Sequence, residues 1–166
     1  MHDVADPTRV RRMRSSMLSD NVHAIDLVSL LYVSRSLIQE GDAEAQLGDI
    51  VSVALARNQS LQVTGALLFT GAYFAQALEG PRRAVTELMD KIERDPRHRD
   101  VSTVSLGPLR TRLFPDWAMA YSGPSPYFDR HVKPLLSPFT ADEQKNDLVE
   151  SLLDELRSVR PSRLTG

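Results

Sequence analysis

The chain has 166 residues, the size of one domain with some tail, and its 42% hydrophobic and 25% charged residues are ordinary for a soluble globular protein. A formal net charge of -2 gives no electrostatic basis for nucleic acid or an anionic membrane as the main partner, and no apolar run approaches the roughly 18 residues of a bilayer span. The sequence has no cysteine, which excludes disulfides, thiolate metal sites and cysteine nucleophiles. We therefore expect a soluble, cytoplasmic protein.

The first 23 residues are polar and lack sustained hydrophobic periodicity. Four arginines gather there, at positions 9, 11, 12 and 14. They would suit a basic arm that touches a partner, but a short polar terminus is more often a solvated tail. We expect a flexible extension over residues 1–23.

The first ordered element is a strand that begins near Ile25. Two sets of residues alternate along it, Val28, Leu30, Tyr32 and Ser34 with Leu27, Ser29, Leu31 and Val33, and both sets are largely apolar. This pattern indicates a central strand that is covered on both faces. Tyr32 lies near its end, where a tyrosine usually fills the core with its hydroxyl hydrogen-bonded, and a functional role would require a specific partner for that hydroxyl.

A helix is predicted from about Asp42 to Arg57. Its apolar residues recur at helical spacing, at Leu47, Ile50, Val51, Ala54 and Leu55. Asn58 continues the same stripe at the C-terminal end. An asparagine there commonly ends a helix, whereas one that points inward could hold the carbonyl or amide of a ligand.

Two strands follow, Val63–Phe69 and Tyr73–Glu79, joined by a short turn. Because side chains alternate along a strand, Phe74, Gln76 and Leu78 share one face of the second strand. A carboxamide between two large apolar residues faces a core or a pocket, where its donors and its acceptor must find partners. Gln76 is therefore an unusual residue for this strand face, and its amide requires hydrogen-bond partners from elsewhere in the chain.

The next helix is predicted from Pro81 to about Arg94, with an apolar face at Val85, Leu88, Met89 and Ile92. Lys91, Asp95 and His98 lie at and beyond its end. They form either a solvated charge cluster or a ligand-facing site. The four histidines of the chain show no paired spacing, so no metal site is predicted.

Two further strands are predicted, a weak one at Val101–Leu106 and a last one at Phe114–Tyr121. The order β-α-β-β-α-β-β predicts an α+β, ferredoxin-like sheet with two helices on one face.

A final helix follows the prolines beyond Gly123, with a capping-box pattern at Thr140 and Glu143. Its apolar stripe comprises Leu148, Leu152, Leu156 and Val159. This stripe packs either on the other face of the sheet, which we favour, or on another subunit.

Five short segments stand in unbroken order between about Ala24 and Gly123. They are Tyr32-Val-Ser34-Arg, Asn58 with Val63-Thr64-Gly65, Phe74-Ala-Gln76-Ala-Leu78-Glu79-Gly80, Arg94-Asp95-Pro-Arg97-His98 and Phe114-Pro-Asp-Trp117-Ala-Met119. Each segment is weak alone, but all five in register resemble the BLUF family of blue-light sensors that use FAD. The resemblance implies a ferredoxin-like fold in which the isoalloxazine ring lies between the two helices.

The resemblance assigns the photoactive residues. Tyr32 corresponds to the redox-active tyrosine of the family, and Gln76 to the glutamine between that tyrosine and flavin N5 and O4. Ser34 is the small polar neighbour of this pair. Trp117 and Met119 occupy the last-strand positions whose exchange in and out of the pocket relays the signal.

The same correspondence implies the flavin-binding residues. Asn58 matches the asparagine on the O4/N3 edge of the ring, and Ile50 and Ile92 stand where aliphatic side chains sandwich it. The pyrimidine edge and the ribityl-phosphate side fall to three residues at the end of the second helix, Lys91, Asp95 and His98.

Three positions depart from the family pattern. Arg57 stands near flavin O2, where relatives often carry Asn or His, and Lys91 replaces a frequent Arg, which keeps the charge but loses the guanidinium fork. Val33 is a modest change on the opposite face of its strand. None of these changes removes Tyr32, Gln76 or Asn58, so the sequence favours photochemical competence over a flavin-free copy.

The resemblance implies a mechanism. Light drives transfer of an electron and then a proton from Tyr32 to the flavin, and Gln76 rotates or tautomerises. The changed hydrogen bonds would then reposition the last strand through Trp117 or Met119, and with it the C-terminal helices.

Two alternatives share the fold. A flavin-free ferredoxin-like interaction module would show the same core periodicity, because fold does not fix function. An acylphosphatase-like hydrolase is disfavoured, since no phosphate-cradling glycine-rich loop lies beside an Arg–Asn pair on the right elements. We expect a sensor rather than an enzyme.

We expect three parts, a tail at 1–23, a flavin-binding domain at 24–123 and helices at 124–166. No catalytic domain fits after Gly123, so the output is expected to pass through a separate protein partner or through self-assembly. We expect neither nucleic acid nor a membrane as a partner, and we expect a homo-oligomer.

Overall fold

The computed structural model describes residues 26–116, 120–122 and 128–159. The elements, in chain order, are β1 (Leu27–Ser36), the 3-10 turn η1 (Glu40–Asp42), α2 (Ala43–Ser60), β2 (Thr64–Phe69), β3 (Tyr73–Pro81), α3 (Arg82–Glu93), β4 (His98–Pro108), β5 (Ala120–Ser122), α4 (Asp129–Val132), the 3-10 turn η3 (Lys133–Leu136) and α5 (Asp142–Ser158). The strands form one sheet in the order β4-β1-β3-β2-β5. All neighbours are antiparallel except β2 and β5, which are parallel.

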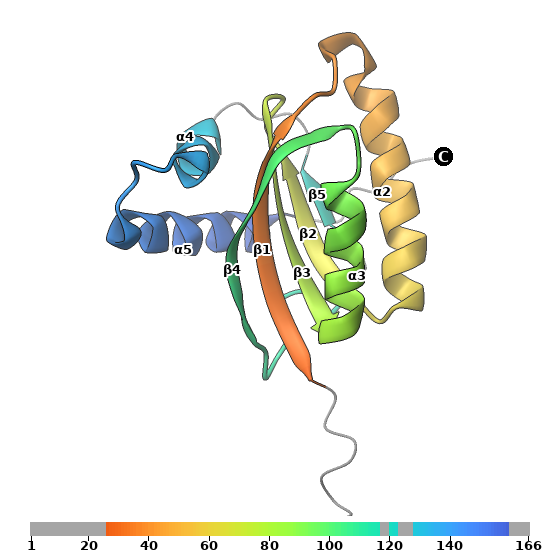
Figure 1. The fold of residues 1–166 in the computed structure, drawn as a ribbon. Helices are drawn as coiled ribbons and strands as arrows, with labels where there is room; N and C mark the ends of the chain where they lie inside the picture. Colours follow the sequence, from red (N-terminus) through yellow and green to blue (C-terminus); the bar gives the residue numbers. More distant parts are fainter. Residues whose placement is uncertain (1–25, 117–119, 123–127, 160–166) are drawn as a thin grey trace, which may run out of the picture.

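Helices cover both faces of this sheet (Figure 1). Helices α2 and α3 lie on one face, and α4 and α5 lie on the other. The predicted ferredoxin-like architecture, with two helices on one face and C-terminal helices on the other, is confirmed.

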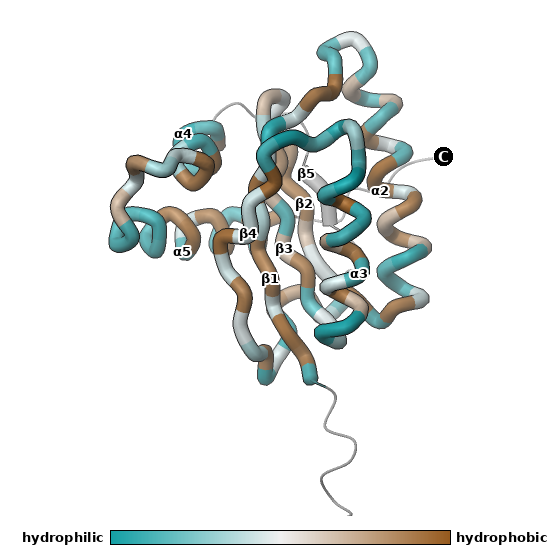
Figure 2. Tube along the Cα trace, in the orientation of Figure 1, coloured by the Kyte–Doolittle hydropathy of each residue, from teal (hydrophilic) through white to brown (hydrophobic). Residues whose placement is uncertain are grey.

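Strand β1 shows how the sequence pattern builds the two layers. Val28, Leu30 and Tyr32 are buried under α2 and α3, whereas Leu31 and Val33 are buried on the side of α5. A strand with apolar residues on both of its faces is stable when both faces are covered. Figure 2 accordingly shows much of β1, β2 and β3 as hydrophobic.

The C-terminal helix covers the face of the sheet that α2 and α3 leave open. Leu152 and Leu156 are fully buried in one cluster with Leu31, Ala75 and other residues of the sheet. The predicted packing of the last apolar stripe on the sheet is therefore confirmed. The capping box is wrong, because Ala141 occupies the N-cap and the hydroxyl of Thr140 donates to the carbonyl of Pro134 at 2.7 Å.

Two predicted strands have other bounds. Strand β4 runs from His98 to Pro108, well beyond the predicted 101–106. Residues 114–116 are irregular, and β5 begins at Ala120 instead of Phe114. The backbone N–H of Phe114 donates to the carboxylate of Glu79, and Pro115 has no N–H, so neither has a backbone donor left for a strand ladder. Trp117, Met119 and the extension at 1–23 lie outside the described residues.

Candidate functional site

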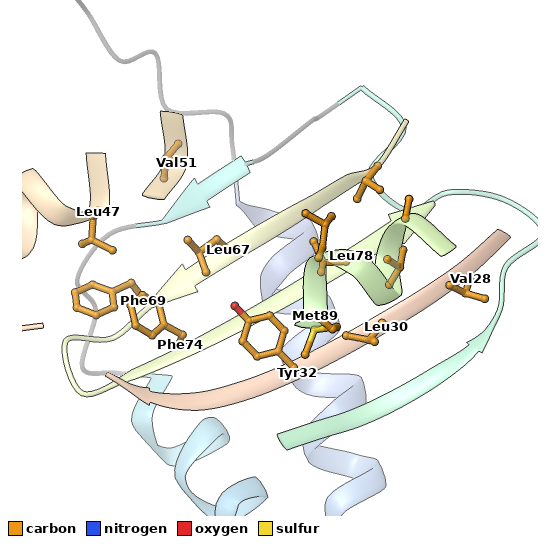
Figure 3. Close-up of a cluster of buried hydrophobic side chains, with 14 residues drawn as sticks. Val28, Leu30, Tyr32, Leu47, Val51, Leu67, Phe69, Phe74, Leu78 and Met89 are labelled. Carbon is orange, nitrogen blue, oxygen red and sulfur yellow. The ribbon is translucent and has the colours of Figure 1, made fainter. Parts of the chain in front are cut away.

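Tyr32 and Gln76 lie directly opposite each other on β1 and β3. Their side chains share the face under α2 and α3, because each follows the alternation of its own strand. The Tyr32 hydroxyl donates to Oε1 of Gln76 at 2.7 Å, and the two residues are 1% and 6% exposed. Figure 3 shows the tyrosine ring among apolar side chains, with its oxygen directed across the sheet. The amide that was unexpected in the sequence thus has a specific partner.

A pocket of about 640 Å³, including its open mouth, adjoins this pair. It is lined by both helices of this face and by the strands beneath them. Its lining includes every residue that the resemblance assigned to flavin binding, namely Tyr32, Ile50, Arg57, Asn58, Gln76, Lys91, Ile92, Asp95 and His98. The fold therefore brings together side chains that are up to 66 positions apart in the sequence, from Tyr32 to His98.

The pocket has apolar sides and a polar inner surface. Ile50 on α2 and Ile92 on α3 contribute aliphatic carbon from the two helices. Asn58, in the last turn of α2, is 1% exposed and lines the pocket, as expected for an inward-pointing amide. Two aliphatic groups with buried amides between them fit a flat, apolar ring that carries hydrogen-bonding atoms on its edge.

His98 lies beside the Tyr32–Gln76 pair. Its Nδ1 is 2.8 Å from Oγ of the buried Ser34, and its ring meets Tyr32 edge-on, with 6.1 Å between the centroids, and tilts over Phe74 at 4.3 Å. Burial lowers the pKa of His98 to about 4, although the charge of Asp95 opposes this. The imidazole is therefore neutral at pH 7. Ser34 thus contacts the site through His98.

Charged groups gather at the mouth of the pocket. Burial alone would raise the pKa of Asp95, but hydrogen bonds from the guanidinium and the backbone of Arg97 lower it overall. Lys91 forms an exposed ion pair with Glu87 at 2.6 Å, and Arg57 is exposed. The pocket lining therefore includes one carboxylate and three cationic side chains, of which Lys91 and Arg97 already form ion pairs.

Sequence reasoning missed several lining residues. Arg97 is the most important, since it stands between Asp95 and His98, which were both assigned, and that position could have revealed it. The others are apolar side chains for which the sequence predicted at most a place on an apolar face of a helix or strand. They are Val53, Ala54, Leu67, Leu78 and Leu88.

The comparisons with known proteins decide the family. Residues 27–120 match the family model described as BLUF, sensors of blue light using FAD. The chain belongs to the BLUF family. It is thus a member of a family of flavin-binding blue-light sensors, and the lining of its pocket, with aliphatic sides and buried amides, fits an isoalloxazine ring.

Curated BLUF relatives are much longer proteins. Photoactivated adenylate cyclase subunit beta of Euglena longa is 38% identical over 94 residues, which are 56% of this chain and 11% of the relative. The blue light- and temperature-regulated antirepressor BluF of Escherichia coli K12 is 40% identical over 75 residues, 45% of this chain and 18% of the relative. The chain thus corresponds to less than a fifth of the length of either relative.

Solved BLUF structures share the fold over more of the chain. The dark-state structure of BlrB is 32% identical, has a TM-score of 0.61 and covers 81% of this chain and 100% of BlrB. The photo-activated state of BlsA is 23% identical, has a TM-score of 0.67, and covers 83% of this chain and 99% of BlsA, so it supports the fold alone.

Residues 26–116, 120–122 and 128–159 contain neither a membrane-spanning helix nor a cluster of metal-ligating side chains. None of the helices described there combines the length and the hydrophobicity that crossing a membrane requires. The same residues contain no group of three or more His, Cys, Asp or Glu side chains that could hold a metal ion.

Proposed function

We propose that this chain senses blue light with FAD bound in the pocket between α2 and α3. The observation that carries the proposal is the buried hydrogen bond from Tyr32 to Gln76, because both residues line the pocket that α2 and α3 form over the sheet. Membership of the BLUF family supports the same function. A flavin-free interaction module would gain nothing from burying this phenol–amide pair beside a pocket.

The residues that the resemblance assigned to flavin binding have proposed roles toward the ring and its tail. Asn58 binds the O4/N3 edge of the ring, and Ile50 and Ile92 hold its two faces. Arg57 faces the O2 side, while the pyrimidine edge and the phosphate side meet Lys91, Asp95 and His98. We add Arg97, because its guanidinium lines the pocket and is oriented by Asp95.

In the proposed mechanism, Tyr32 is the electron and proton donor. Bound flavin supplies a strong oxidant when it absorbs blue light. Burial first, and the charge of Asp95 second, raise the pKa of Tyr32, so the phenol stays protonated before light. Its proton leaves along the hydrogen bond to Oε1 of Gln76. Gln76 then rotates or tautomerises, which exchanges donor for acceptor at the pocket surface.

The output is proposed to leave through the C-terminal part of the chain. Residues 24–123 form the light-sensing domain, preceded by the extension at 1–23, and residues 124–166 carry the signal after Trp117 or Met119 repositions the last strand. A separate protein partner receives the signal in the cytoplasm, and the sensor is a homo-oligomer. The sensor itself performs no enzymatic reaction.

The test is spectroscopic. The purified chain should be yellow, and blue light should cause a reversible red shift of the flavin absorption that Tyr32→Phe abolishes. Tyr73→Phe is the matched control, because Tyr73 is also a buried tyrosine of the sheet but belongs to the cluster on the side of α5. It should keep the shift.

Colourless protein that takes up no added FAD would refute the sensor proposal, and a red shift that survives Tyr32→Phe would refute the mechanism. Chromatography of the released flavin distinguishes FAD from FMN and riboflavin.

A further inference from the structure

Glu79 is a fully buried carboxylate that the proposed photochemistry does not use. It lies on β3, three residues after Gln76, which corresponds to roughly 10 Å along a strand. Because side chains alternate, Glu79 belongs to the opposite face of β3, with Tyr73, Ala75 and Ala77. A buried carboxylate in a central strand requires strong partners.

The partners of Glu79 come from the segment between β4 and β5. The backbone N–H of Leu113 donates to both carboxylate oxygens, at 3.0 and 2.9 Å, and the N–H of Phe114 donates to one of them at 3.1 Å. Hydrogen bonds to an ionised acceptor are about twice as strong as neutral ones. The side chain of Glu79 therefore holds the backbone of the segment that leads toward β5.

Arg112 makes the reciprocal connection. Its Nη1 donates to the backbone carbonyl of Glu79 at 2.7 Å and to Oγ1 of Thr64 at 2.8 Å, and its Nη2 donates to the carbonyl of Gln62 at 2.6 Å. The side chain of the strand thus holds the backbone of the segment, and the side chain of the segment holds the backbone of the strand. Thr64 pairs with Glu79 in the sheet, so β2 shares the connection.

The electrostatic surroundings link Glu79 to the C-terminal helix as well. Burial raises its pKa, and the two backbone hydrogen bonds, then Arg112, then Arg157 oppose that rise. Arg112 stands on the segment and Arg157 on the last turn of α5. Both cations therefore favour the ionised form that accepts the N–H groups of Leu113 and Phe114.

We propose that Glu79 and Arg112 are positioning residues that couple β3, the strand of Gln76, to the segment entering β5. The coupling rests on the proposed light-driven switch at Gln76. The clamp itself is the set of hydrogen bonds that join Glu79 to residues 112–114, and it exists without light. A shift of β3 carries residues 112–114 with it, because bonds run in both directions between them. These bonds give the switch a path from the pocket face of the sheet to its other face.

The first experiment tests the clamp in the dark, by NMR of the full flavin-loaded chain. The amide proton shifts of Leu113 and Phe114 should titrate together, with one midpoint above the ordinary pKa of a glutamate. Glu79→Gln should remove this titration. Amides of Leu113 and Phe114 that show no shared titration in the wild type would overturn the proposal, even if the variant fails to fold.

The second experiment tests the coupling with blue light. In Glu79→Gln we expect the red shift of the flavin to persist, while the light-induced amide shifts of residues 112–114 and 120–122 fall roughly twofold or more. Glu143→Gln, on the exposed start of α5, is the matched control and should retain the full response.

The two proposals fail in distinguishable ways. A wild-type chain without any red shift refutes the proposed function, and the dark titration then decides separately whether the clamp exists. A Glu79→Gln chain with undiminished amide shifts in light overturns the coupling. Loss of the red shift in Glu79→Gln would also overturn the coupling, since it would assign Glu79 a role in building the pocket itself.

Discussion

Acidification should destabilise this protein through His98. The folded-state pKa of His98 is about 4, against an ordinary value near 6.5, because the ring is buried beside Tyr32 and Phe74. A lowered folded-state pKa contributes stability that is fully present above the unfolded pKa and is lost as the pH falls toward the folded one. Between about pH 7.5 and about pH 5 the two pKa values correspond to a loss of about 2 kcal/mol.

The assay is guanidinium denaturation of the flavin-free chain at these two pH values, so that ligand release adds no pH dependence of its own. His98→Gln retains a polar side chain beside Ser34 but cannot take up a proton. Carboxylates also titrate in this range but are present in both proteins, so the difference between wild type and variant isolates His98. Equal losses of unfolding free energy in the two proteins would refute the reasoning.

Three further predictions concern packing and burial. Gly65→Ala would place a Cβ 2.0 Å from the carbonyl oxygen of Ala77 and should cost about 3 kcal/mol or more. The same change at Gly48, in α2 with open space around it, should instead stabilise by up to about 1 kcal/mol, and opposite signs in thermal denaturation check both. Leu152→Ala should cost about 2–5 kcal/mol, whereas Leu106→Ala, at a 55% exposed position, should cost far less, and equal losses on denaturation would contradict the packing of α5. Glu79 has a raised pKa, so its contribution to stability should grow as the pH falls from its folded-state pKa to its ordinary value; Glu79→Gln should lack that gain in the same denaturation series.

The fold could be predicted from the sequence because its signals are local and periodic. Continuous apolar alternation in β1 indicated a strand covered on both faces, and the helical spacing of Leu152 and Leu156 indicated a helix that needs a surface to cover. The apolar stripe did not indicate which surface the helix covers. In the structure it packs on the sheet of its own chain.

The site was predictable to a lesser depth. Gln76 could be found because a carboxamide interrupts an apolar face, and its partner Tyr32 stands opposite it in register. The contacts of Glu79 could not be found, because they join backbone groups 34 and 35 positions away and leave no trace in the local pattern. The irregular backbone at Phe114 escaped prediction for the same reason, since its N–H is taken by Glu79.

The α5 side of β3 has small side chains at its centre. Ala75 and Ala77 on β3, with Ala66 on β2, lie in the cluster that buries Leu152 and Leu156. The methyl groups of these alanines form no ridges between which a leucine of α5 could interlock. Separating α5 from the sheet would expose apolar area, whereas sliding along it would not. We therefore expect that β3 can shift slightly beneath α5 without exposing the apolar side chains that the helix covers.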